Sequence, residues 1–73
     1  MDRALLEDHL AKAKRHVQAG EQHSARQIAI IANLERRGHD TTTAKRLLEQ
    51  FQEALAVYIQ GRDRLQAELG RSP

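Results

Sequence analysis

The apolar and small residues of this chain recur at alternating steps of four and three, and this spacing constrains the fold most strongly. In the first half it continues from residue 6 to residue 34 without a change of phase. Two core positions in every seven residues are typical of helices that pack along one stripe, as in a coiled coil. The second half repeats the pattern, so we predict an all-α protein. The positions are Leu6, Leu10, Ala13, Val17, Gly20, Ser24, Gln27, Ile31 and Leu34, and then Ala44, Leu48, Phe51, Leu55, Tyr58, Arg62, Leu65 and Leu69; the polar residues Ser24, Gln27 and Arg62 interrupt the pattern.

One short segment separates the two halves of this pattern. Gly38 suits the left-handed position that follows a helix, and Arg36 and Arg37 precede it, where a last helical turn favours cations. Asp40, or a threonine after it, can cap the next helix. We therefore predict an antiparallel two-helix hairpin within a single domain over residues 1–73.

The turn sets the lengths of the two helices, which we predict at about residues 3–37 and 41–69. Gly20 suggests an alternative, because Ser24 and Gln27 have the capping-box spacing of a new helix start. The chain would then be a monomeric three-helix bundle broken near Gly20. We favour the continuous helix, since the register passes through the glycine without a phase slip.

Folding the chain at the turn also predicts which residues lie side by side. It places Ile31 opposite Leu48 and Gly20 opposite Tyr58. A glycine that faces the only tyrosine would be a match of small to large, which close helix packing can use.

Size and apolar content predict that the chain associates with itself. A lone core in a chain of 73 residues seldom supplies more than ~3–5 kcal/mol, and with Cys 0 no disulfide adds to it. The apolar residues also point in more directions than one partner helix can cover. We predict a homodimer of hairpins that forms a four-helix bundle; the alternative is an apolar patch left bare on a monomer. The predicted dimer core contains Ile28, Ile30, Ile31, Leu47, Leu48, Phe51, Leu55, Tyr58 and Ile59.

Three histidines, His9, His16 and His23, are spaced seven residues apart. One interpretation is a ladder of metal or haem ligands. Seven residues span about 10.5 Å of helix, however, while the ligands of one ion lie about 2 Å from it. We therefore expect no metal and no cofactor, and instead a row of rings that pack against the partner. Because histidine titrates near pH 6.5, such a row could make the dimer sensitive to pH.

Folding at the turn gathers positive charge at one end of the hairpin. Arg36, Arg37, Lys45 and Arg46 are candidate contacts for an anion or a nucleic acid, helped by the positive end of the second helix. Capping and solubility explain the same residues, since arginine suits a last helical turn and Lys45 with Glu49 is a common surface pair. The net charge of +2 is too small to favour nucleic acid by itself.

The remaining features exclude several classes of function. The carboxylates are scattered, and the sequence contains no Gly-rich phosphate loop and no nucleophile motif. No apolar run approaches the ~18–20 residues of a membrane span. We expect a cytoplasmic, non-enzymatic protein that acts by self-association and protein–protein interaction. A small nucleic-acid-binding regulator is the alternative, and metal or haem binding by the histidine row is a weaker one.

Several runs in the sequence resemble a set of short bacterial proteins. The similarity is carried by Glu21-Gln22-His23, by Leu34–Thr41 and by Leu47-Leu48 with Phe51, and it covers most of the chain. Those proteins are all-helical and their function is unknown, so the resemblance implies no activity. In architecture alone, a dimerising hairpin of this length is similar to the small plasmid copy-number regulator that binds paired RNA loops, but fold does not confer function.

Overall fold

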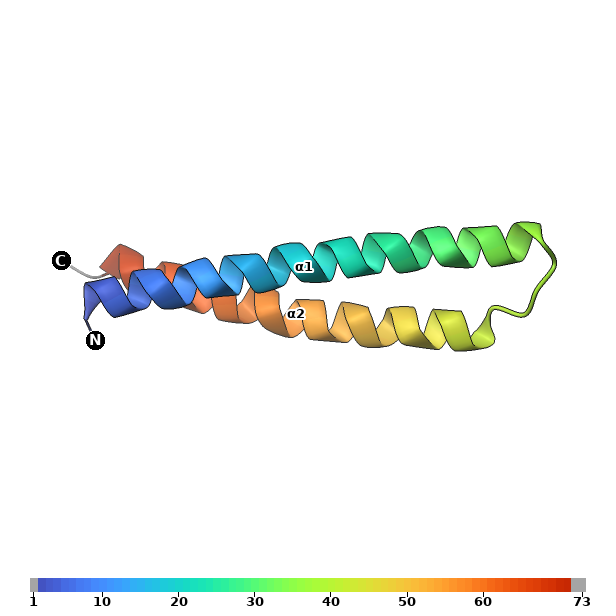
Figure 1. Ribbon diagram of the computed structural model, residues 1–73. Coiled ribbons are helices and arrows are strands. Elements are labelled where there is room, and N and C mark those ends of the chain that lie inside the picture. The colour runs from blue at the N-terminus through green and yellow to red at the C-terminus, as the bar shows by residue number, and fades with distance from the viewer. Residues whose placement is uncertain (1, 72–73) are drawn as a thin grey trace.

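The computed structural model describes residues 2–71, which form an antiparallel hairpin of two long helices (Figure 1). Helix α1 spans Arg3–Arg36 and helix α2 spans Thr42–Arg71. No strand occurs among the residues described. The predicted all-α hairpin is confirmed, with helix ends that differ from the prediction by two residues or fewer.

Helix α1 continues through Gly20, so the alternative of a break at this residue is wrong. Gly20 is buried, and a Cβ built on it would lie 3.0 Å from Cδ1 of Leu55. The missing side chain therefore allows α2 to approach α1 closely. The predicted partner, Tyr58, was wrong by one helical turn. The reason is visible at the turn, where α1 extends beyond the start of α2, so the chain does not fold symmetrically about His39 (Figure 1).

Helix α1 ends at a glycine with a left-handed backbone, as predicted. Gly38 has a φ of 72°, a conformation that residues with a Cβ rarely adopt. The amide of Gly38 donates to the carbonyl of Glu35 at 3.1 Å, and the amide of His39 donates to the carbonyl of Leu34 at 2.9 Å. These two bonds form a Schellman motif, which satisfies carbonyls at the end of a helix.

Asp40 and Thr41 together begin α2. Oδ1 of Asp40 accepts hydrogen bonds from the amide of Thr42 at 3.0 Å and from the Thr42 hydroxyl at 2.7 Å. Because these bonds, the amide bond first, stabilise the charged carboxylate, they hold the pKa of Asp40 below its usual range. The carbonyl of Thr41 accepts the amide of Lys45 at 2.9 Å, so Thr41 occupies the cap position.

The core of the hairpin is the stripe that the seven-residue register predicts. Leu6, Val17 and Ile31 of α1 expose 3%, 3% and 7% of their surface. Gln27 is also buried, and its Nε2 donates to the carbonyl of Ala44 at 3.0 Å, which satisfies a polar group inside the seam. No described residue of α2 is buried to the same degree. Two helices alone therefore enclose only a thin core.

The hairpin is a rod, with the start of α1 and the end of α2 at the same end of it (Figure 1). Its extents are 57 × 14 × 13 Å and its radius of gyration is 16.6 Å. A compact domain of this length has a radius of gyration of about 11 Å. Neither helix, within the residues described, combines the length and apolar character needed to cross a membrane.

Candidate interaction surface

The seam leaves two long sides of the hairpin uncovered, and each side contains a groove. Residues seven apart keep to one side of a packed helix, so the groove linings assign the neighbouring residues as well. We call one side the histidine side; it contains His9, His16, His23 and Ile30 of α1 and Leu47, Ala54, Val57 and Tyr58 of α2. We call the other the acidic side; it contains Glu7, Glu21, Ile28 and Glu35 of α1 and Lys45, Glu49, Ile59 and Asp63 of α2.

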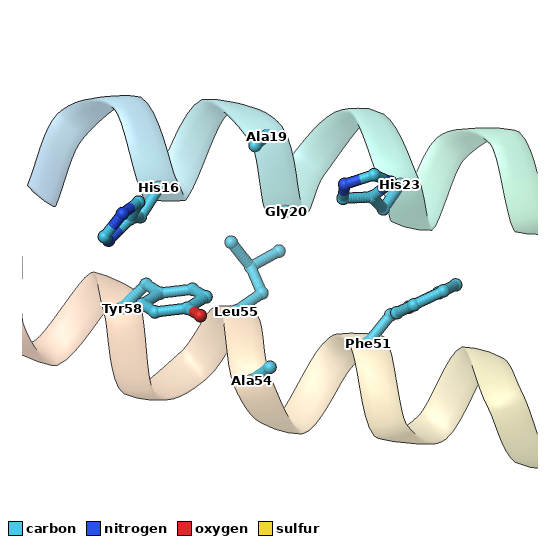
Figure 2. Close-up of a pocket in the computed structure, with 8 residues that line it drawn as sticks. All are labelled: His16, Ala19, Gly20, His23, Phe51, Ala54, Leu55 and Tyr58. Atoms are coloured by element: carbon cyan, nitrogen blue, oxygen red, sulfur yellow. The ribbon is translucent and has the colours of Figure 1, made fainter. Parts of the chain in front are cut away.

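The groove on the histidine side has a volume of about 230 Å³ and lies between two pairs of rings. The rings of His16 and Tyr58 have centroids 5.1 Å apart and are tilted by 48°. The rings of His23 and Phe51 have centroids 5.8 Å apart and are stacked at 27°. Figure 2 shows these pairs flanking Leu55, with α1 and α2 each supplying one ring of a pair. The groove thus has aromatic walls.

Small residues line the middle of the same groove. Ala19 and Gly20 come from α1 and Ala54 comes from α2 (Figure 2). Because these residues have at most one side-chain carbon, another backbone or a large side chain can approach closely here. The histidines His9, His16 and His23 are all exposed. The predicted row of packed rings is present at His16 and His23, and the rings pack on α2 of the same chain.

Large apolar side chains are exposed mainly on the histidine side. Ile30 follows His23 by seven residues, Leu47 precedes Ala54 by seven, and Val57 lies one turn beyond Ala54. Of the six large apolar residues that the described chain exposes, only Ile28 lies on the acidic side. The other five are Leu5, Ile30, Leu47, Val57 and Tyr58.

Charge differs between the two sides as well. On the acidic side, Nζ of Lys45 lies 3.8 Å from Oε2 of Glu35 and links the two helices. The acidic side carries five carboxylates and two lysines: Glu7, Glu21, Glu35, Glu49, Asp63, Lys14 and Lys45. The rim of the histidine side carries five cations and one carboxylate: Lys12, Arg26, Arg37, Arg64, Arg71 and Glu68. Arg3 and Arg62 pair with Glu7 and Asp63 and partly neutralise the acidic side, and Asp8 pairs with Lys12 of the other side. With these groups counted, the acidic side is still net negative and the histidine side net positive.

The structure divides the predicted dimer core among three places. The seam of the hairpin already covers part of it: Ile31, Leu48, Phe51 and Leu55 are buried or half-buried there. The histidine side exposes Ile30, Leu47 and Tyr58, while Ile28 and the half-buried Ile59 belong to the acidic side. Leu5 and Val57, which the predicted dimer core does not include, are also exposed, and their spacing from Ala19 and Ala54 places them on the histidine side.

The four predicted basic residues at the turn are exposed, but they do not share one face. Lys45 lies on the acidic side, where it pairs with Glu35. Arg37 continues the stripe of Ile30 on the histidine side, and the register places Arg36 and Arg46 on the outer surfaces of their helices. The turn therefore offers no single basic patch.

The described residues contain no cluster of potential metal ligands. Within residues 2–71, no three or more histidine, cysteine, aspartate or glutamate side chains lie close enough together to hold one ion. The chain matches no family model, no curated protein and no solved structure.

Proposed function

We propose that this chain is a non-enzymatic helical protein that acts by associating with itself, a second hairpin completing a four-helix bundle. The observation that carries the proposal is the surface a single hairpin leaves exposed. The hairpin exposes 5434 Å². A compact monomer of 8.3 kDa exposes about 4,600 Å². The excess of roughly 850 Å² is close to the area that each partner buries in a stable complex, about 800 Å².

The thin core supports the same proposal. Leu6, Val17 and Ile31 are the apolar side chains buried within the described chain, and all three belong to α1. A protein of this size needs a further source of stability, and with Cys 0 it is not a disulfide. Burial of the exposed apolar residues against a second copy supplies it, at roughly 25 cal/mol for each Å² removed from water.

Binding to a further protein is the second part of the proposed role. A four-helix bundle formed through one side of each hairpin keeps the other side in water, together with the charged turn. Those surfaces are rich in charge, which favours selective and transient contacts over permanent ones. Nucleic-acid binding is supported less well, because the seven-residue register places Arg36, Arg37, Lys45 and Arg46 on different faces of the two helices.

The mass of the protein in solution tests the proposal. In sedimentation equilibrium over a series of concentrations, we expect a species of twice 8.3 kDa that dissociates on dilution. Circular dichroism on the same samples should show helicity falling as the dimer dissociates, since the single hairpin has a thin core. A mass of one chain at every concentration, with full helicity, would contradict the proposal.

A further inference from the structure

We infer that the second copy packs on the histidine side, with the same side of each chain in contact. The inference rests on the proposed self-association and adds the surface that it uses. Five of the six exposed large apolar side chains of the described chain lie on this side. By the seven-residue register they extend along the rod from Leu5 to Ile30 on α1 and from Leu47 to Tyr58 on α2. A partner of the same length can cover all of them at once.

A contact between two histidine sides is favoured over a contact between unlike sides for two reasons. If the histidine side of one copy packed on the acidic side of the next, one apolar side would stay bare at the end of every assembly. Carboxylates would also leave water, including Glu35 in its pair with Lys45, and the cost of removing charges from water often exceeds what pairing returns. A two-fold contact between histidine sides covers both apolar surfaces and leaves the carboxylates hydrated.

The groove gives this contact a centre. Ala19, Gly20 and Ala54 line its middle beside Leu55, and the ring pairs His16–Tyr58 and His23–Phe51 flank it on either side (Figure 2). A side chain of the second copy can enter the 230 Å³ between them. The rings are already packed on their partners within one chain, at centroid distances of 5.1 and 5.8 Å, so little further ordering is required on association.

Two isoleucines on α1 provide a matched test of the surface. Ile28 and Ile30 are two residues apart, hence about 200° apart around the helix. They expose 52% and 44% of their surface in the single hairpin, so glutamate disturbs each hairpin to a similar extent. Ile30→Glu would place a carboxylate in the proposed contact, whereas Ile28→Glu would add one to a side that is already acidic.

We expect Ile30→Glu to raise the dimer Kd by at least about 30-fold, because it would bury an unpaired carboxylate in the contact. Ile28→Glu should change the Kd by less than about threefold. Val57→Glu repeats the test from α2, and because Val57 is 65% exposed the variant should fold even if Ile30→Glu does not. All variants are compared by sedimentation equilibrium, with helicity measured on the same samples.

The other outcomes distinguish failure of the proposed function from failure of the inferred contact. A parent protein that stays monomeric removes the proposed function itself. A dimer that survives both Ile30→Glu and Val57→Glu, or that dissociates with Ile28→Glu, overturns the inference while self-association stands. A mass that keeps rising with concentration indicates contact between unlike sides, and it also overturns the inference.

Discussion

The histidine side and the acidic side of the hairpin are built on the same two helices, yet they expose opposite chemistry. The histidine side presents large apolar side chains and packed rings, with cations along its rim. The acidic side presents five carboxylates, and the Glu35–Lys45 pair links its helices. Both sides share one seam, so the difference comes from the residues that flank it. The repeat of seven determines the hairpin, and the flanking positions determine what the hairpin can bind.

Replacing a small residue in each groove with leucine compares how tightly the two sides are packed. Gly20→Leu places its Cβ 3.0 Å from Leu55, so the rest of the side chain must push the helices apart. Overpacking costs about 1–3 kcal/mol, partly offset by the better helix propensity of leucine, roughly 0.8 kcal/mol. We expect a net loss of about 1–2 kcal/mol in the free energy of unfolding, measured by urea titration at one fixed protein concentration.

Ala32→Leu is the matched change on the acidic side. Ala32 lines a groove of about 440 Å³, which has room for the larger side chain. Its effect should stay within about 0.5 kcal/mol. If Gly20→Leu is as stable as the parent protein, the close approach of α2 at residue 20 is contradicted.

The sequence predicted the seam and the turn because both depend on local rules. The helix continues through Gly20 as predicted, and Gly38 has the predicted left-handed backbone. Asp40 and Thr41 begin the second helix, as the sequence also predicted. The partner of Gly20 was predicted wrongly, since the overhang of α1 at the turn depends on how the connection packs in three dimensions. The predicted dimer core mixed seam residues with residues of both sides. Periodicity shows that Ile28 and Ile30 diverge, but only the structure shows that Ile28 lines a groove together with Glu35 and Lys45.

Salt distinguishes the two sides by the sign of its effect. In the inferred dimer, the cations at the rim of one histidine side face those of the other, so screening should strengthen association. We expect the Kd to fall about two- to fivefold between low ionic strength and about 0.3 M sodium chloride. The variant Lys12→Gln/Arg26→Gln is the control, and its response should be weaker. Association that weakens with salt would instead indicate contact between the histidine side and the acidic side.

The smallest expected effect concerns the ion pair of the acidic side. Lys45 and Glu35 are each 56% exposed at the side chain, and Nζ and Oε2 are 3.8 Å apart, so water and salt screen their attraction. A double-mutant cycle with Glu35→Gln and Lys45→Gln should give a coupling energy below about 0.5 kcal/mol in the free energy of unfolding. A second copy on this side would exclude water from the pair, and removing one partner would then leave the other charge buried. In that case each single substitution would lower the free energy of unfolding by several times the coupling energy expected for an exposed pair. A small coupling in the associated protein, at a concentration where the dimer is fully formed, therefore means that the acidic side stays in water while the histidine side is covered.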